Sequence, residues 1–151
     1  MGDDIPPCEL NRVVNAGDHF GFPFFHGKNI PDTGFEAPKD FVFSQPVWEF
    51  QAHTAPLGIK FYDGEGFPEY YKNGAFVAQH GSWNRSEKVG YRLLFMKMEE
   101  GDVVSADVFI DGWMSNETSW GRPVTPLILK DGSMLISDDQ ADSIIRVTYK
   151  G

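Results

Sequence analysis

A weak internal repeat constrains the fold of this chain more than any other feature of its sequence. One copy begins at Pro56 and a second at Pro123, and both follow the same order of segments. Each copy has an apolar run, an Asp-Gly turn, a second short apolar run, a polar loop and a third run. A repeated unit of this kind cannot bury its apolar face alone, so we expect neighbouring copies to pack against each other.

The repeated segments are predicted to be β-strands. Pro and Gly interrupt every window of about 12 residues through position 74, and such windows do not favour long helices. Several segments alternate apolar and polar side chains, as a strand with one buried face does. The predicted strands are 57–62, 75–79, 91–98, 103–110, 124–130, 134–138 and 143–149. Repeated four-stranded antiparallel units are typical of β-propeller blades.

The two copies differ in length. The first continues into a fourth strand at 103–110, whereas the second has only three strands before Gly151. A partial third copy is visible at 9–14, where ELNRVV is similar to the segment 144–149. We therefore predict an all-β chain that holds about two blades and the end of a third, as part of a propeller. Because a propeller closes by pairing its last blade with its first, open sheet edges are expected, and we interpret the chain as a piece of a longer protein.

We expect residues 1–151 to form one domain, because this length fits a single domain. The region 15–50 is dense in Gly, Pro and Phe, and it is predicted to be a long ordered loop. That loop should lead to a strand near 47–50. Long loops inside compact domains are usually functional or insertional.

Charge and composition exclude several kinds of protein. The net charge of −9 repels phosphates, so nucleic acid is not an expected partner. A single cysteine, Cys8, excludes an internal disulfide. No run approaches the roughly 18 apolar residues of a membrane span. The segment 1–11 lacks the features of a signal peptide, so the signal of an exported protein is expected upstream of this sequence.

The loop 80-HGSWNR-85 stands where the second repeat has 138-DDQAD-142. Both loops join the second predicted strand of a repeat to the third. One carries His, Trp and Arg, whereas the other is acidic and is interpreted as a solvated turn. This contrast indicates a role in ligand binding for 80–85, and a plain polar loop is the alternative.

Six ordered stretches resemble one protein family. They are PPCELNRVVNAGDHFGFP, HTAPLGIKFYDGEGFP, FVAQHGSWNR, GYR, WGRPV and DGSMLISDDQADSIIRVTY. In this order they are similar to the C-terminal part of the glucose/sorbosone dehydrogenase family, with the sorbosone branch nearest. The resemblance implies a six-bladed β-propeller that binds pyrroloquinoline quinone (PQQ) and calcium, in a periplasmic or secreted protein. It also implies transfer of hydride from a sugar C–OH group to PQQ.

The resemblance places no catalytic base in this chain. In the family, a histidine from an earlier blade deprotonates the substrate hydroxyl, and no residue here matches it. We therefore expect the chain alone to be inactive. The alternative functions are a non-catalytic propeller module that binds a carbohydrate or a protein, and an orphan reading frame that assembles through its open sheet edges.

The resemblance also implies residues that contact the cofactor. PQQ is a planar tricarboxylate, which suits arginine and flat aromatic surfaces. Arg122, in WGRPV, and Arg85 are the candidate cations, with a structural arginine and a solvated loop arginine as the alternatives. Trp83 and Trp120 flank them in sequence, and ordinary packing between blades is the alternative for both.

Two histidines and two carboxylates complete the candidate site. His53, in HTAP, matches a position next to the cofactor in the family. His80 is a further cofactor candidate, with a structural histidine bonded to backbone as the alternative. Asp4 and Glu9 adjoin the family's calcium loop and supply the oxygen ligands that calcium prefers. An acidic, exposed N-terminus is the alternative for these two, and Cys8 departs from the acidic residue common in relatives.

Overall fold

The structure is a computed structural model, and it describes residues 2–151. These residues form antiparallel sheets and one short 3-10 helix, Glu69–Tyr71. The predicted all-β class is confirmed. Among the described residues, no helix is long and apolar enough to cross a membrane. The chain divides into two compact units, one ending at His53 and one spanning Thr54–Gly151. A single domain over 1–151 stays a prediction.

The first unit is built from two small ladders. Strand β1 (Cys8–Leu10) pairs with β4 (Trp48–Phe50), which confirms the strand predicted near 47–50. Strand β2 (Phe25–His26) pairs with β3 (Ile30–Pro31) inside the region predicted to be loop. The partial repeat at 9–14 forms strand only as far as Leu10. Stacked phenylalanine rings pack this unit, and they belong to Phe25, Phe41 and Phe43.

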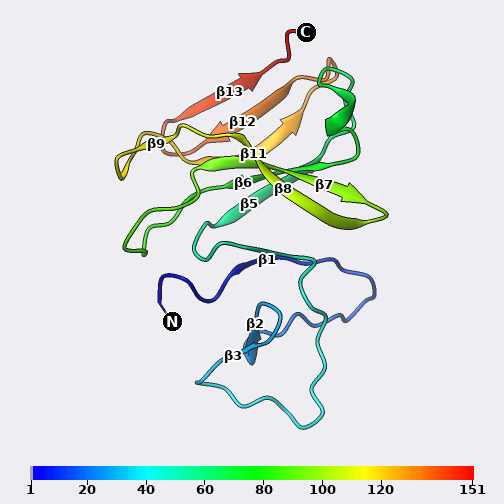
Figure 1. Ribbon diagram of the computed structural model, residues 1–151, viewed down its shortest axis with the longest axis vertical. Coiled ribbons are helices and arrows are strands. Elements are labelled where there is room, and N and C mark those ends of the chain that lie inside the picture. The colour runs from blue at the N-terminus through cyan, green and yellow to red at the C-terminus, as the bar shows by residue number, and fades with distance from the viewer. Residues whose placement is uncertain (1) are drawn as a thin grey trace. The chain divides into compact units, whose positions relative to one another are not determined.

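The first complete repeat forms a four-stranded antiparallel sheet in the order β5-β6-β7-β8 (Figure 1). Its strands are β5 (Pro56–Phe61), β6 (Ala75–Gln79), β7 (Arg92–Glu99) and β8 (Asp102–Ile110). Each begins and ends within two residues of the predicted bounds. The sheet has the strand number and order of one propeller blade.

The second repeat forms a three-stranded antiparallel sheet, which confirms its predicted strand count. Its strands are β11 (Pro123–Ile128), β12 (Met134–Asp138) and β13 (Ser143–Val147). Both repeats have a register shift directly after their opening proline. A small hairpin, β9 (Met114–Ser115) with β10 (Thr118–Ser119), lies in the connection between the two sheets.

The two sheets of the second unit pack against each other, and β11 contacts both β5 and β6 (Figure 1). Their shared core contains buried residues of both repeats, among them Phe76, Leu93, Met134 and Ile136. The fold is therefore that of a partial β-propeller, in which adjacent blades bury one another's faces.

Candidate functional site

Three connecting segments gather at one end of the second unit. Segment 80–91 joins β6 to β7, segment 111–122 joins β8 to β11, and segment 139–142 joins β12 to β13. Because adjacent strands run antiparallel, all three connections leave the sheets at the same end. We call these three segments the loop end. It contains five of the eight predicted site residues.

The loop after β6 is fixed at its base by backbone hydrogen bonds. The Gly81 N–H donates to the Thr54 carbonyl at 3.0 Å, and the Ser82 N–H donates to the Val89 carbonyl at 2.9 Å. The buried Tyr91 hydroxyl donates to the Ser82 carbonyl. Gly81 has φ +100°, and a Cβ there would lie 2.5 Å from the Tyr91 ring. The HGSW sequence therefore needs its glycine at this turn.

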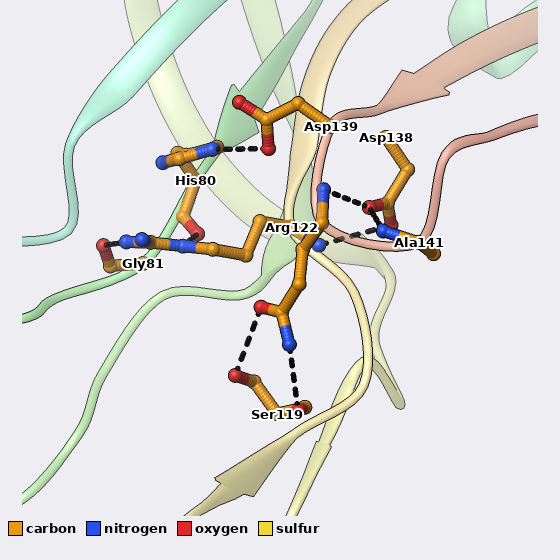
Figure 2. A network of polar contacts seen from close by, with 8 residues as sticks. His80, Gly81, Ser119, Arg122, Asp138, Asp139 and Ala141 are labelled. Carbon is orange, nitrogen blue, oxygen red and sulfur yellow. Dashed lines mark hydrogen bonds and ion pairs between the residues drawn. The ribbon is translucent and has the colours of Figure 1, made fainter.

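Arg122 connects the second repeat to the loop of the first (Figure 2). Its Nε donates to the His80 carbonyl at 3.1 Å, and its Nη2 donates to the Gly81 carbonyl. The guanidinium carbon lies 5.5 Å from the centre of the Tyr91 ring, within the range of a cation–π contact. Two of the five guanidinium N–H groups are thus directed at carbonyl oxygens, and three are left for a ligand.

Asp138 holds the corresponding turn of the second sheet together (Figure 2). Its carboxylate accepts backbone N–H groups from Gln140 at 3.0 Å, Ala141 at 2.8 Å and Arg122 at 2.9 Å. Only 4% of the residue is exposed. The interpretation of 138–142 as a solvated turn is therefore wrong for this residue. The sequence feature that could have indicated this buried role is an Asp at the end of an apolar strand, where its carboxylate can cap the turn that follows.

His80 and Asp139 join the two equivalent loops directly. The His80 Nε2 lies 2.8 Å from an Asp139 carboxylate oxygen. The hydrogen bond from His80, together with the positive charges of His80 and Arg122, lowers the pKa of Asp139. The loop 80–85, which carries His and Arg, and the acidic loop 138–142 are therefore in contact. Their difference in charge makes them complementary partners.

The two candidate tryptophans differ in their surroundings. The Trp120 indole N–H donates to the Gly112 carbonyl at 2.6 Å, and its ring stacks on that of Trp113 at a centroid distance of 6.2 Å. Trp83 is 82% exposed at the tip of its loop, where Arg85 is half-buried. Trp83 thus offers an open aromatic face, whereas one side of Trp120 is used in packing.

The remaining candidates lie in the first unit. His53 has φ +67°, and its Nε2 is 3.0 Å from the Gly2 carbonyl oxygen. The Glu9 carboxylate accepts the Gly27 N–H at 2.6 Å and the Asn11 side-chain amide at 3.0 Å. Asp4 is exposed. Within residues 2–151, no group of three or more His, Cys, Asp or Glu side chains is placed to hold a metal ion.

Comparison with known proteins identifies the family. The profile of a family described as TrAA12-like matches residues 37–150, which is most of the sequence. The chain belongs to the TrAA12-like family. A similar uncharacterized protein from Borreliella burgdorferi is 42% identical over 155 residues. The aligned part is 99% of this chain and 41% of that relative, so the chain spans about two fifths of the relative's length.

Solved structures with the same fold are also longer than this TrAA12-like chain. The calcium structure of a Trichoderma reesei carbohydrate-active enzyme of family AA12 has a TM-score of 0.74 and 22% identity, over 97% of this chain and 44% of that one. A glucose dehydrogenase has a TM-score of 0.71 and 19% identity, over 99% and 40%. The PQQ domain of a pyranose dehydrogenase from Coprinopsis cinerea has a TM-score of 0.52 and 21% identity, over 71% and 30%.

These similarities establish the fold of the TrAA12-like chain. Its candidate site follows from the contacts of its own residues. The structure brings Arg122, His80 and Asp139 together, and it places Trp83, Arg85 and Trp120 in the same set of connecting segments. Five of the eight residues that sequence reasoning selected lie at this end, and their role in cofactor binding stays a prediction. Sequence reasoning did not identify Asp138 and Asp139, which organise this end.

Proposed function

We propose that residues 1–151 are the C-terminal part of a quinoprotein dehydrogenase that acts on sugars or other aldoses, sorbosone-like substrates included. Membership in the TrAA12-like family supports this function, as do the fold matches to proteins described as a glucose dehydrogenase and as a PQQ domain. The observation that carries it is the loop end, where two backbone carbonyls hold the Arg122 guanidinium and the same set of connecting segments carries the exposed Trp83.

The residues of the loop end suit PQQ. The ligand is a planar tricarboxylate, so it needs cations that oppose the net charge of −9. Arg122 keeps three N–H groups for a carboxylate, and Arg85 is the second candidate cation. We propose that Trp83 and Trp120 provide aromatic surface for the ring system, as their places at the loop end allow.

Both candidate histidines are proposed as cofactor contacts, one in each unit of the chain. We propose that the contact between His80 and Asp139 fixes the backbone carbonyls of His80 and Gly81. These two carbonyls accept hydrogen bonds from Arg122 and so orient its guanidinium group. His53 is proposed as a cofactor contact from the first unit, on the family resemblance alone. Neither residue is assigned a proton-transfer role in this proposal.

Calcium is proposed at Asp4 and Glu9, with further ligands from elsewhere in the intact protein. Glu9 already accepts two hydrogen bonds, and residues 2–151 hold no group of three or more His, Cys, Asp or Glu side chains placed for a metal. A calcium ion normally takes six to eight oxygen ligands. Asp4 and Glu9 would therefore contribute only a part of the coordination sphere.

In the proposed reaction this chain binds and orients, and it does not remove the substrate proton. PQQ, when bound, would supply the acceptor for the hydride of the sugar carbon. Arg122 and Arg85 would neutralise the carboxylates of the cofactor and fix its orientation, because guanidinium–carboxylate pairs are directional. We propose that the catalytic base lies in the missing part of the propeller, so the isolated chain should be inactive.

The intact protein is proposed to act in the periplasm or outside the cell, on a small sugar or aldose. Its partners are proposed to be the N-terminal part of the propeller or, when that part is absent, a second copy that pairs through an open sheet edge.

Titration of the intact protein with PQQ and calcium tests the proposed function. We expect an absorbance change and a calorimetric signal, with affinity reduced about 10-fold or more by Arg85→Gln, because one charge-assisted pair contributes about 1.5–3 kcal/mol. Lys130→Gln, which changes an exposed cation in another loop, is the matched control. Absence of PQQ binding by the intact protein would contradict the quinoprotein assignment.

Trp83 favours a second function, the binding of a carbohydrate or a protein without catalysis. An indole that is 82% exposed offers a flat apolar surface with one N–H donor, which a sugar ring or a protein partner could cover. The two functions separate in the same titration. Binding of sugar without PQQ, lost in Trp83→Ala, would favour the module.

A further inference from the structure

We propose that Glu117 is a positioning residue for the proposed ligand site, because it holds the tip of the loop after β6 in place. We call residues 83–87 the tip, and it carries Trp83 and Arg85, two of the candidate contacts for PQQ. Glu117 stands in the connection between β8 and β11 and makes its contact through Lys88. This inference rests on the proposed function for the identity of the ligand, and it adds a residue that acts without touching that ligand.

The first observation is a reciprocal pair of hydrogen bonds, which we call the clasp. The Lys88 backbone N–H donates to the Glu117 carboxylate at 2.8 Å, and the Lys88 Nζ donates to the Glu117 carbonyl at 2.6 Å. Lys88 follows the tip directly, and Glu117 lies 29 positions further along the chain. Each charged side chain bonds a backbone group of the other residue, so the clasp fixes the orientation of both segments as well as their separation.

The second observation is the narrow neck below the tip. The Ser82 N–H donates to the Val89 carbonyl at 2.9 Å, and the Val89 N–H donates to the Ser82 hydroxyl at 3.0 Å. Below this pair, a Cβ on Gly90 would lie 2.8 Å from the Cα of Gly81. Two chain segments this close form a single point of attachment, about which the tip can swing. The clasp attaches the loop outside the neck, so it limits that motion.

The third observation is the backbone conformation at Glu117. Asn116 and Glu117 lie between the paired residues Ser115 and Thr118 of the β9–β10 hairpin, and their φ angles are +48° and +62°. A two-residue turn in which both φ angles are positive favours Asn-Gly, because glycine adopts this conformation without steric cost. Glutamate at the second position is therefore unfavourable for the turn itself. Its presence indicates a separate role for the side chain, and the clasp is that role.

Glu117→Gly separates positioning from stability, because it removes the clasp and gives the turn its preferred residue. We expect the thermal midpoint of the intact protein to stay the same or to rise. The affinity for PQQ should nevertheless fall about 5-fold, since a tip that samples more orientations loses more freedom on binding. A residue that only stabilised the fold would behave differently. A lowered midpoint with unchanged affinity would therefore refute the positioning role.

Hydrogen exchange of the intact protein without PQQ tests the clasp by itself. The probe is the backbone amide of Lys88, which donates the first bond of the clasp. We expect this amide to exchange at least about 10-fold faster in Glu117→Gly than in the unmodified protein. In Glu117→Gln the exchange should stay nearly as slow, because the side-chain oxygen of glutamine can still accept the bond. Equally slow exchange in all three proteins would overturn the inference.

Glu87→Gln is the matched control for charge. Glu87 is an exposed carboxylate at the end of the tip, so its replacement changes the net charge by the same amount as Glu117→Gly and leaves the clasp intact. We expect Glu87→Gln and Glu117→Gln to bind PQQ as the unmodified protein does. An equal loss of affinity in Glu87→Gln and Glu117→Gly would assign the effect to charge alone and would contradict the inference.

Failure of this inference differs from failure of the proposed function. Fast exchange of the Lys88 amide in Glu117→Gly with unchanged PQQ affinity would refute the positioning role and leave the proposed function standing. Absence of PQQ binding by the unmodified protein, with fast exchange in Glu117→Gly alone, would contradict the quinoprotein assignment and support the clasp as the attachment of the tip.

Discussion

Replacing Arg122 with methionine should destabilise the second unit in the absence of any ligand. The side chain donates to the His80 and Gly81 carbonyls and lies over the Tyr91 ring, so it joins the second repeat to the loop of the first. Methionine keeps most of the length of the side chain and removes its charge and all of its N–H groups.

The magnitude follows from these contacts. A hydrogen bond from a charged group contributes about 1.5–3 kcal/mol, and a partly exposed cation–π contact about 0.5–1 kcal/mol. Water can partly replace the lost donors, because Arg122 is only half-buried. We therefore expect a loss of about 2–4 kcal/mol in the free energy of unfolding. For a unit of this size, that loss lowers the melting temperature by roughly 8–16 °C.

Thermal unfolding followed by circular dichroism measures the effect on the chain 1–151. Lys130→Met is the matched control, since Lys130 is exposed, and it should leave the melting temperature nearly unchanged. Arg122→Lys should fall between the two, because an ammonium group cannot reproduce the guanidinium fork. A melting temperature of Arg122→Met within about 1 °C of the unmodified chain would refute the structural contribution and leave only ligand binding for this arginine.

Three further predictions concern the loops of the second unit. The pKa of Asp139 is lowered chiefly by its hydrogen bond with His80. The ionised carboxylate therefore stabilises the folded state above the ordinary pKa of an aspartate, and this contribution is lost as the pH falls through the lowered pKa. Asp139→Asn should make the free energy of unfolding in urea less pH-dependent below pH of about 4. Gly132→Ala should lower the free energy of unfolding by at least about 2 kcal/mol, since a Cβ would lie 2.1 Å from a backbone nitrogen. Gly112→Ala, with positive φ and open space around it, should lower it by about 1 kcal/mol. Equal losses for the two variants in denaturant melts would contradict the steric argument. Tyr62→Phe should cost about 1–3 kcal/mol in the same assay, because the buried hydroxyl both donates and accepts a hydrogen bond, and an unchanged midpoint would disprove that contribution.

The strand pattern was readable from the sequence because alternation of apolar and polar residues reports directly which side chains face a core. All seven predicted strands of the second unit exist. The two copies of the repeat, which begin at Pro56 and Pro123, also share a register shift after the opening proline. The β2–β3 ladder inside the region 15–50 was not predicted. Its two-residue strands are too short to show any alternation.

The candidate site was readable only in part. The unusual composition of 80-HGSWNR-85 marked one loop, and its position between the second and third strands of the repeat is confirmed. The partners of that loop were not visible, because Arg122 and Asp139 lie about 40 to 60 positions further along the chain. No local pattern reports a contact over such a separation.

The sequence by itself determined that this chain forms antiparallel sheets in two related copies, because strand periodicity and turn residues are local properties. Only the tertiary structure decided that the two polar loops meet and that Asp138 is buried as the cap of its turn. Those features depend on how one sheet packs on the other, and packing is decided by contacts between residues that are distant along the chain.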